Sequence, residues 1–545
     1  MNRWISTTVL AAAVAAAALT AGVAPADAKN TLRWASQGDA LTSDPHSQNE
    51  GPTNAASLNI HDPLIRRNAK SALEPSLALS WKTINPTTWE FKLRQGVKFH
   101  DGTPFTAEDV VFSIGRAMSP TSDFRSYLDS VAEVKKIDDA TIHFITKGPN
   151  PILPSQLTQI AIMSKAWSEK HKVEKPQDFK NKEETYAIRN TNGTGPFILR
   201  KRDPSIETVL ERNPAWWGWR TAQGGGNVDE VIYKPIKNAA TRVSALLTGE
   251  IDFVLDPPVQ DLDKIKKETK LKVTQTPQIR TIFFGMDVGR NELRTSDIKG
   301  KNPFADKRVR QAIQLAIDAQ AIKRVVMRNM SAPAGIVTSP GVHGYTAALD
   351  KPVAANVDQA KALMKQAGYE KGFSVKLDCP NDRYTNDEQI CQAIVGMLGK
   401  IGIKIQLDAQ SKTLHFPKIQ KSESDFYLLG WGVPTQDSHY VFNYLYATKA
   451  GQKGVWNGTG YGTKKMDDLI AKMEVEIDLK KRDALIAEAW ALAKAELIYV
   501  PIHHQVISWA MVKTMDLPIV VDDAPNFRWA KMAPAAAPVP AKKTN

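Results

Sequence analysis

Residues 89–117 read WEFKLRQGVKFHDGTPFTAEDVVFSIGRA, and this stretch predicts a strand, a turn and a helix in that order. Apolar and charged residues alternate in WEFKLR, which is typical of a half-buried strand, and Val97 and Phe99 resume the alternation after a glycine. Thr106, followed three positions later by Asp109, forms a capping box that predicts the start of a helix. The apolar residues of this helix recur at helical spacing, so we expect one of its faces to be buried.

The segment LRQGVKFHDGTPFTAEDVVFS, residues 93–113, closely resembles the fingerprint of the extracytoplasmic solute-binding proteins that serve peptide ABC transporters, the dipeptide- and oligopeptide-binding family. Two later segments, GTGPF at 193–197 and NPAWWG at 213–218, resemble the same family, and the resemblance covers roughly residues 30–532. It implies an α/β fold of the periplasmic binding protein type II. In that fold, two lobes are joined by a two-segment hinge and the first lobe carries an extra subdomain.

The length of the chain also predicts more than one lobe. Its 545 residues exceed what a single hydrophobic core usually serves. Residues 228–256 alternate strand, helix and strand, the rhythm of a mainly parallel sheet, and crossings between the lobes are expected near 280–288 and 504–510. On the family plan, the expected boundaries are 29–75, 196–283 and 508–532 for lobe I, 76–195 for the extra subdomain, and 284–507 for lobe II.

The N-terminus predicts export. Arg3 precedes an almost wholly apolar run at residues 9–23, and Ala26-Asp27-Ala28 matches the small-residue pattern of a cleavage site. We therefore expect a signal peptide at 1–28, cleaved near Ala28, and a periplasmic mature protein. The Pro- and Ala-rich tail at 533–545 is expected to be disordered.

The charge pattern argues against nucleic-acid binding. The formal net charge is +13, from 71 Lys and Arg against 58 Asp and Glu, but the sequence contains no run of five or more basic residues. Dispersed basic residues are typical of a solvated surface, so we expect no nucleic-acid partner.

The chain contains two cysteines, Cys379 and Cys391. An oxidising compartment favours their pairing, and a metal site would need more ligands close by. The first cysteine ends a strand-like segment and the second lies early in a helix-like one. We therefore predict a disulfide and no metal site.

Catalysis is not expected, because the sequence lacks the G-x-S-x-G, H-E-x-x-H, Walker A and Cys-His patterns. Neither a cofactor nor a catalytic residue is predicted. His503 and His504 are adjacent, so on a strand their side chains point to opposite faces. One of the two could face a ligand cleft, and we take His503 as the candidate, although the sequence leaves open which of them does.

A better centre for binding is DFYLLGWGVPTQD, residues 425–437. Trp431 offers a broad apolar face and one N–H donor, and the flanking Gly430 and Gly432 let another group approach closely. In the family that the chain resembles, the matching Gly-Trp pair lines the ligand cavity. The resemblance also places Glu50, Gly51 and Tyr127 near the ligand.

The chain departs from its relatives at Pro434. Peptide-binding members typically have an aspartate there, whose carboxylate pairs with the α-ammonium group of the ligand. A buried ammonium needs a carboxylate partner, so Asp437, Glu50 or another acid substitutes, or the ligand has no free amine in that place. Asp437 has a second interpretation, as the cap of the following helix.

The sequence therefore predicts a monomeric, periplasmic substrate-binding component of an ABC importer. It would bind a short peptide or peptide-like solute between its lobes, close around it, and deliver it to the permease subunits in the membrane. One alternative is a protein for a non-peptide solute, such as an opine, a nickel chelate or a sugar. The other is an extracytoplasmic sensor or peptide-holding protein that serves no transporter.

Overall fold

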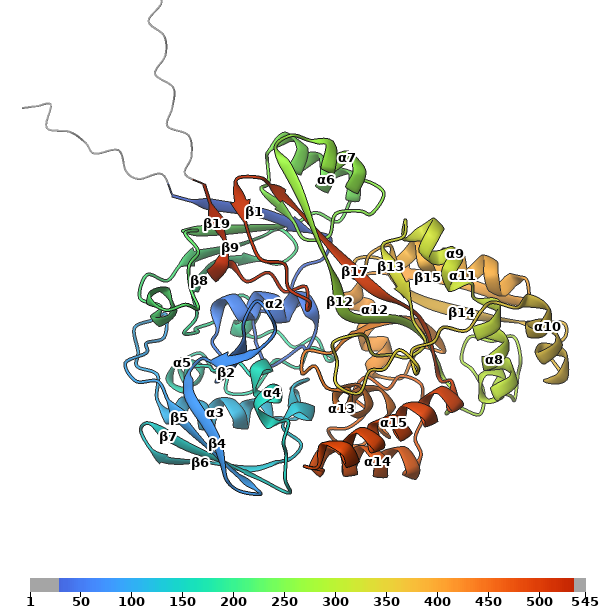
Figure 1. Cartoon of the computed structure of the whole chain (residues 1–545), viewed down its shortest axis with the longest axis horizontal. Helices are drawn as coiled ribbons and strands as arrows, with labels where there is room; N and C mark the ends of the chain where they lie inside the picture. Colours follow the sequence, from blue (N-terminus) through green and yellow to red (C-terminus); the bar gives the residue numbers. More distant parts are fainter. Residues whose placement is uncertain (1–28, 534–545) are drawn as a thin grey trace, which may run out of the picture.

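The computed structural model describes residues 29–533, which form two α/β lobes and a subdomain (Figure 1). The predicted α/β fold of two lobes is therefore confirmed. The predicted signal peptide at 1–28 lies outside the described residues, and so does the predicted disordered tail apart from residue 533. Within the described range, no helix has both the length and the apolar character needed to cross a bilayer.

One mixed sheet of eleven strands runs through both lobes. Ten strands follow one another along it in the order β15 (Ile403–Gln410), β14 (Phe373–Pro380), β16 (Phe426–Gly432), β12 (Leu271–Met286), β17 (Tyr499–Val512), β11 (Phe253–Val254), β1 (Thr31–Ser36), β10 (Glu230–Pro235), β9 (Glu207–Arg212) and β8 (Phe197–Asp203). The eleventh strand, β13 (Ser331–Pro333), pairs with β17. The βαβ unit predicted at 228–256 is confirmed, since β10 and β11 both run parallel to β1 and α6 (Ala239–Thr248) connects them.

Two long strands, β12 and β17, cross from one lobe to the other (Figure 1). They are antiparallel neighbours: Leu271 pairs with Val512 in lobe I, and Gly285 pairs with Tyr499 in lobe II. Because each strand belongs to the sheet of both lobes, the lobes are joined by two adjacent, hydrogen-bonded segments. The sheet is mixed where the sequence predicts a mainly parallel one, because these central strands are antiparallel to their neighbours.

The subdomain contains a second, antiparallel sheet with the strands β4 (Ala78–Asn85), β5 (Thr88–Leu93), β7 (Thr141–Thr146) and β6 (Val131–Asp138) in that order. As predicted, WEFKL lies in a strand, and the capped helix α3 (Ala107–Ala117) begins after Thr106, whose backbone N–H donates to Asp109 at 2.9 Å. The prediction that the strand resumes at Val97 and Phe99 is wrong. Gly96 and Gly102 take φ values of +75° and +88°, which turn the chain and leave a single β-bridge at Lys98.

The helices form two groups. One group belongs to lobe I and the subdomain, and the other belongs to lobe II. The first group is α2 (Gly51–Ile60), α3, α4 (Leu153–Gln156), α5 (Lys165–Lys170), α6 and α7 (Leu262–Lys267). The second group is α8 (Lys307–Ala316), α9 (Ala319–Ala321), α10 (Val357–Gln366), α11 (Asp387–Gly399), α12 (Lys412–Gln420), α13 (Ser438–Val441), α14 (Lys464–Val475) and α15 (Leu479–Glu496). Two small pairs of strands complete the fold, β2 (Ile65–Arg67) with β3 (Leu73–Pro75) and β18 (Met515–Asp516) with β19 (Lys531–Met532).

An apolar stripe with helical spacing is divided between two helices. The stripe lies at 309–322, but α8 ends at Ala316 because Ile317 has an extended backbone. Asp318 then caps α9, accepting a hydrogen bond from the N–H of Ala321 at 2.8 Å. A capping aspartate can therefore end one helix and start another inside an uninterrupted apolar pattern.

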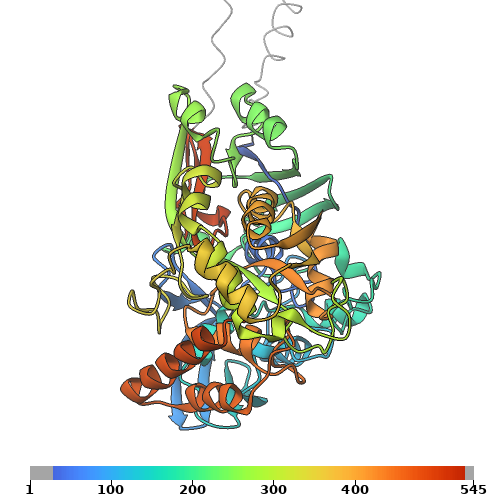
Figure 2. The ribbon, with the colours of Figure 1, turned by 90° about the vertical axis from the view of Figure 1, so that its right-hand side faces the viewer.

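The subdomain and lobe II are in contact. A single hydrophobic cluster contains Phe124 and Tyr127 of the subdomain together with Trp431 and Tyr440 of lobe II. At the lower edge of the molecule, α14 lies beside the subdomain in both views, and a Cβ atom on Gly148 would stand 3.2 Å from Val475 (Figures 1 and 2). The structure therefore shows the lobes closed upon one another.

Candidate ligand-binding site

Two adjoining cavities lie between the lobes. The smaller has a volume of about 730 Å³ and the larger about 1400 Å³, and both volumes include space that is open to solvent. Gly51, Arg280, Arg383 and Asp522 line both cavities and therefore mark the place where they meet. Gly51 belongs to lobe I, Arg383 to lobe II, and Arg280 to the crossing strand β12. Residues of both lobes and of a crossing strand therefore meet at this junction.

Five of the predicted site residues line the smaller cavity: Glu50, Gly51, Gly430, Trp431 and Gly432. Gly51 lines the larger cavity as well. The other three, Tyr127, Asp437 and His503, lie outside the walls of these two cavities. The sequence thus brings together residues from the start of α2 and the end of β16, which are almost 400 positions apart in the chain.

Trp431 forms part of an aromatic wall of the smaller cavity. Its ring stacks on Tyr440 at a centroid distance of 5.5 Å and packs edge-on against Trp456 at 5.7 Å. The indole N–H groups of both tryptophans are buried and have no hydrogen-bond acceptor among the described residues. The wall therefore offers a ligand a wide apolar surface together with two unused donors.

The glycines on either side of Trp431 make room for side chains of the protein. A Cβ atom on Gly430 would stand 2.7 Å from the ring of Tyr384, and one on Gly432 would stand 3.3 Å from Arg280 Nη2. We predicted close approach by another group at both positions. The groups that approach are the Tyr384 ring and the Arg280 guanidinium, and these two groups form the next part of the cavity wall.

Arg280 and Arg383 are two site residues that the sequence analysis missed. A Cβ atom on Gly51 would stand 2.6 Å from Arg383 Nη2 and 3.5 Å from Arg280 Nη2, so the two guanidinium groups meet at the first residue of α2. Arg280 donates to the carbonyl oxygen of Gly430 at 3.3 Å, and its Nε–H has no acceptor in residues 29–533. Burial and the neighbouring charge of Arg383 lower the pKa of Arg280 to about 10.

Signals for both arginines are present in the sequence. Arg280 lies in a central strand, just before the apolar run at 282–286, where a buried charge is rare unless it is paired. Arg383 follows the carboxyl end of β14, which pairs in parallel with β15, and such strand ends commonly carry ligand-binding loops.

Glu50 is the N-cap of α2 and links the two lobes. Its carboxylate accepts the N–H of Thr53 at 2.9 Å, lies 3.2 Å from Lys412 Nζ and lies 3.6 Å from Arg383 Nε. Burial alone would raise its pKa, but the charges of Lys412 and Arg383 outweigh burial and lower it. Because these cations belong to lobe II, Glu50 stabilises the closed arrangement and its charge is already neutralised by the protein.

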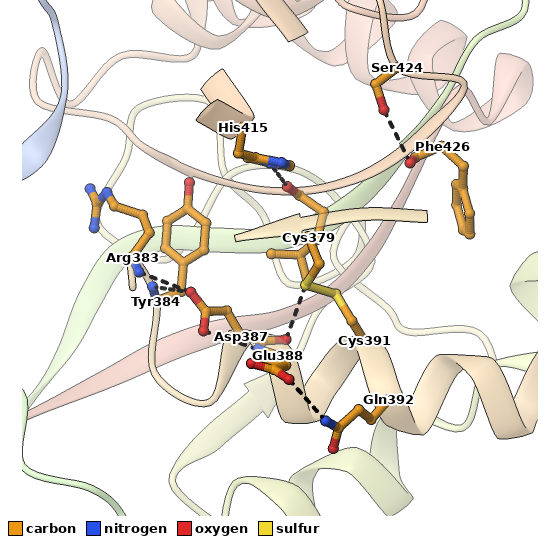
Figure 3. The surroundings of a disulfide bond; sticks show 11 residues. Cys379, Arg383, Tyr384, Asp387, Glu388, Cys391, Gln392, His415, Ser424 and Phe426 are labelled. Carbon is orange, nitrogen blue, oxygen red and sulfur yellow. Dashed lines mark hydrogen bonds between the residues drawn. A yellow bond between two sulfur atoms is a disulfide. The ribbon is translucent and has the colours of Figure 1, made fainter. Parts of the chain in front are cut away.

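The predicted disulfide between Cys379 and Cys391 is confirmed. It joins the end of β14 to α11, and Figure 3 shows the loop between them carrying Arg383 and Tyr384. Asp387 holds the same loop from inside, accepting the backbone N–H groups of Arg383 at 3.0 Å and Tyr384 at 2.9 Å (Figure 3). A covalent bond and a carboxylate thus fix the loop that supplies one guanidinium of the site.

Asp437 caps α13 behind the aromatic wall. It accepts the N–H of His439 at 2.9 Å and two hydrogen bonds from Arg482, both of 2.7 Å, and it lies 2.9 Å from a ring nitrogen of His343. Burial would raise its pKa, but the hydrogen bonds and the charge of Arg482 hold it well below the usual range. These partners occupy the carboxylate, so the structure supports the helix-cap interpretation.

Tyr127 and His503 are also buried away from the two cavities. Tyr127 stacks on Tyr440 at 5.2 Å, and its hydroxyl group accepts a hydrogen bond from Asn49 at 3.4 Å. Tyr127 therefore supports the aromatic wall from behind. His503 is almost fully buried in β17, and burial lowers its pKa to about 3. His504 points to the other face, where it bonds with Thr281 at 2.9 Å.

Known proteins resemble this chain in sequence and share its fold. The glutathione-binding protein GsiB of Escherichia coli (strain K12) is 24% identical over 471 residues, covering 85% of this chain and 86% of that protein. The periplasmic binding protein DppA of Helicobacter pylori, in complex with the peptide STSA, has a TM-score of 0.81 and 23% identity, covering 92% of this chain and 98% of that one. AgaA of A. tumefaciens R10, in complex with agropinic acid, has a TM-score of 0.80 and 24% identity, with coverage of 92% and 98%.

The structural likenesses, at under 25% identity, show the fold alone. Family membership comes from a model of the bacterial extracellular solute-binding proteins, family 5 Middle, which matches residues 72–453. This match spans more than half of the chain and includes the segment at 93–113 and, from the lining of the smaller cavity, Arg280, Arg383 and Trp431. The chain therefore belongs to the bacterial extracellular solute-binding proteins of family 5.

Proposed function

We propose that this chain is the solute-binding component of an ABC importer and that it binds a short peptide or peptide-like solute between its lobes. Membership of the family supports the general role. Relatives named for glutathione binding or solved with a peptide support the class of solute. The observation that carries the proposal is the buried Arg280, whose Nε–H remains without a partner at the junction of both cavities.

The two guanidinium groups fit a carboxylate. Arg280 and Arg383 present N–H donors from two directions toward one point beside Gly51, and a carboxylate can accept several such hydrogen bonds at once. The start of helix α2 adds a partial positive charge at the same point. The Nε–H of the buried Arg280 has no acceptor in the described part of the chain, and a buried cation is costly unless its donors are satisfied, so an anionic ligand group would be bound strongly here.

The rest of the smaller cavity fits the body of a peptide. Trp431 and its neighbours supply an apolar wall, and Gln278 places a buried carbonyl oxygen in the cavity with no donor among the described residues. A peptide provides both an apolar side chain and N–H donors, so it satisfies each of these groups. Burial of the ligand between the lobes would add contacts that exist only in the closed state and so favour closure.

The wider setting of this role follows the sequence expectations. The proposal includes export to the periplasm after removal of residues 1–28, a monomeric state, and docking of the closed form on permease subunits. It keeps the lobe boundaries of 29–75, 196–283 and 508–532, the subdomain at 76–195, and the second lobe at 284–507. The strands β12 and β17 support a hinge of two segments, since each belongs to both lobes.

Two measurements test the class of solute. Mass spectrometry of small molecules released by denaturing the purified protein should find peptides or peptide-like acids, and tri-alanine should change the tryptophan fluorescence of the protein on titration. Arg280→Gln should weaken tri-alanine binding at least tenfold, because it removes a charged hydrogen-bond donor. Arg220→Gln, at an exposed position on the surface, is the matched control and should have no effect.

Other outcomes separate the alternatives. Release of an opine, a nickel chelate or a sugar, with no binding of peptides, would contradict the peptide assignment and keep the solute-binding role. Tight peptide binding by a protein whose loss does not reduce peptide uptake by the cell would instead favour the sensor or peptide-holding alternative.

A further inference from the structure

Two aspartates of the C-terminal segment face the junction of the cavities from lobe I. Asp522 lines both cavities, and Asp523 lines the larger one. Burial raises the pKa of both carboxyl groups, and the positive charge of Arg280 opposes this rise in each, so the acids and the guanidinium act on one another. The junction therefore carries both positive and negative charge.

Neither aspartate is held in a close ion pair by the described residues. Asp522 accepts one hydrogen bond, from the N–H of Ala524 at 3.2 Å, and Asp523 accepts one, from the indole N–H of Trp509 at 2.8 Å. Among the described residues, no lysine, arginine or histidine forms an ion pair with either carboxylate, and one oxygen of each is left for another donor. Burial raises the pKa of Asp522, and it raises the pKa of Asp523 to about 7.

A buried glutamine gives independent evidence that a donor belongs here. Gln505 lines the larger cavity, is only 5% exposed, and has a side-chain carbonyl oxygen with no donor in the described part of the chain. An unsatisfied buried acceptor is uncommon in proteins. A ligand group that donates several hydrogen bonds, such as an ammonium group, would satisfy this oxygen together with the aspartates.

Three other acids near the junction already have charged partners. Glu50 is paired with Lys412, and Asp437 is paired with Arg482. Asp256 lies 3.0 Å from Arg242 and also accepts the backbone N–H of Gln37. Pro434, at the position where the family resemblance leads us to expect an aspartate, has no charge. Asp522 and Asp523 each keep a carboxylate oxygen free at this junction.

We infer that Asp522 and Asp523, together with Gln505, bind the cationic group of the ligand, opposite the carboxylate bound by Arg280 and Arg383. The ligand is then a zwitterion that lies across both cavities, with its ammonium group beside Asp522 and Asp523 and its carboxylate at the start of α2. This inference rests on the proposed function and adds to it the charge pattern of the solute. It also assigns the role of the missing aspartate at Pro434 to a different segment of the chain.

The first test changes the ligand and leaves the protein as it is. Calorimetric titration of the wild-type protein compares tri-alanine with N-acetyl-tri-alanine, which lacks the ammonium group and keeps the carboxylate. We expect acetylation to weaken binding at least tenfold, the usual scale for losing a charged hydrogen-bond donor. Equal affinity for the two probes would overturn the inference, and this result does not depend on the folding of any variant.

The second test changes the protein. Asp522→Asn and Asp523→Asn should each weaken tri-alanine binding about tenfold and leave the weak binding of N-acetyl-tri-alanine unchanged. Asp516→Asn is the control, because its side chain is 77% exposed and lies in β18, away from the two cavities, so binding should not change. Melting temperatures of all three variants show whether each one is folded.

The outcomes separate this inference from the proposed function. Wild-type protein that binds tri-alanine, with unchanged affinity in both aspartate variants, overturns the inference and leaves the proposed function in place. Wild-type protein that binds neither probe overturns the proposed function and the inference with it. Loss of both probes to the same extent in the aspartate variants would show a general disturbance of the cleft and would also overturn the assignment of the ammonium group.

Discussion

Two buried clusters of charge lie near the end of β16, and they differ in how completely the protein satisfies them. Around Asp437, Arg482 forms a two-point ion pair, His343 lies at 2.9 Å, and the cap of α13 uses the same carboxylate. Around Arg280, the guanidinium makes one long hydrogen bond of 3.3 Å and faces two cavities. The first cluster has no capacity left for a ligand, whereas the second has unused donors and acceptors that only a further molecule can match.

The comparison teaches how to tell a structural charge from a binding charge. Burial is similar in the two clusters, with 5% exposure for Asp437 and 8% for Arg280, so burial alone does not separate them. The number of hydrogen bonds that each cluster can still form does separate them, because each buried polar group must find a partner. Four predictions test this distinction, and they follow from the largest expected effect to the smallest.

Removing Asp437 should affect stability more than any other change proposed here. Asp437→Ala leaves the buried Arg482 without its counter-ion, and breaking a buried ion pair typically costs ~3–5 kcal/mol in unfolding free energy. Urea unfolding followed by circular dichroism measures this loss. Asp483→Ala is the matched control, since Asp483 also contacts His343 but is exposed, and it should cost less than ~1 kcal/mol. Similar losses in the two variants would contradict the structural role of Asp437.

Removing the disulfide should reduce stability and leave the site largely intact. Replacing Cys379 and Cys391 by alanine frees a short loop, and loop-closure entropy predicts a loss of ~3 kcal/mol in unfolding free energy. Asp387 still holds the backbone of Arg383 and Tyr384, so the affinity for tri-alanine should change less than tenfold. A folded double variant that no longer binds tri-alanine would show that the disulfide itself positions Arg383.

Trp431→Ala should weaken binding of tri-alanine by ~2 kcal/mol, about thirtyfold, because it removes an aromatic surface from a desolvated cavity. Trp431 also packs against Tyr440 and Trp456, so the variant should melt at a lower temperature, and the titration belongs well below that temperature. Trp81→Ala is the control, since Trp81 lies in β4 of the subdomain and should change stability without changing affinity. Unchanged affinity of Trp431→Ala for tri-alanine would show that the aromatic wall is not part of the binding site.

Much of the fold is readable from the sequence because its signals are local. The capping box at Thr106, the alternation in residues 89–93 and the two cysteines each depend on neighbours within a few positions, and the structure confirms all three. The division of the helix after Ala316 is local too, but it depends on a competition between an apolar stripe and a capping aspartate, which the pattern alone does not decide.

The candidate site is harder to read, because its parts come from distant segments. Glu50, Gly51 and Trp431 are found through resemblance, whereas Arg280 and Arg383 become visible only when lobe closure brings them to Gly51. The sequence cannot show that Arg482, 45 positions away, occupies the carboxylate of Asp437. It also cannot show that Asp522 and Asp523 lack a partner. Whether a buried polar group has a hydrogen-bond partner depends on the whole folded chain. The acid that binds the ligand therefore could not be chosen from the segment 425–437 alone.

The smallest expected effect is the change in unfolding free energy at acidic pH. It directly tests the cluster around Asp437, in which the protein already supplies the hydrogen-bond partners of the carboxylate. Hydrogen bonds and Arg482 hold the pKa of Asp437 below the value of about 3.9 expected in the unfolded chain. A lowered pKa means that the stabilisation is present at neutral pH and is lost as the pH falls below the unfolded value. Between pH 4 and pH 3 the unfolded chain takes up a proton at this position and the folded chain does not, which should cost about 1 kcal/mol in unfolding free energy.

Asp437→Asn cannot take up that proton, so its unfolding free energy, although lower at pH 7, should fall about 1 kcal/mol less than that of the wild type over the same interval. Urea unfolding at pH 7, 4 and 3 measures both slopes, and Asp483→Asn, at the exposed neighbour of His343, should keep the wild-type slope. Equal slopes in wild type and Asp437→Asn would mean that the carboxylate titrates normally in the folded protein. The partners of Asp437 would then not satisfy its carboxylate, and the distinction between the Asp437 cluster and the Arg280 cluster would be wrong.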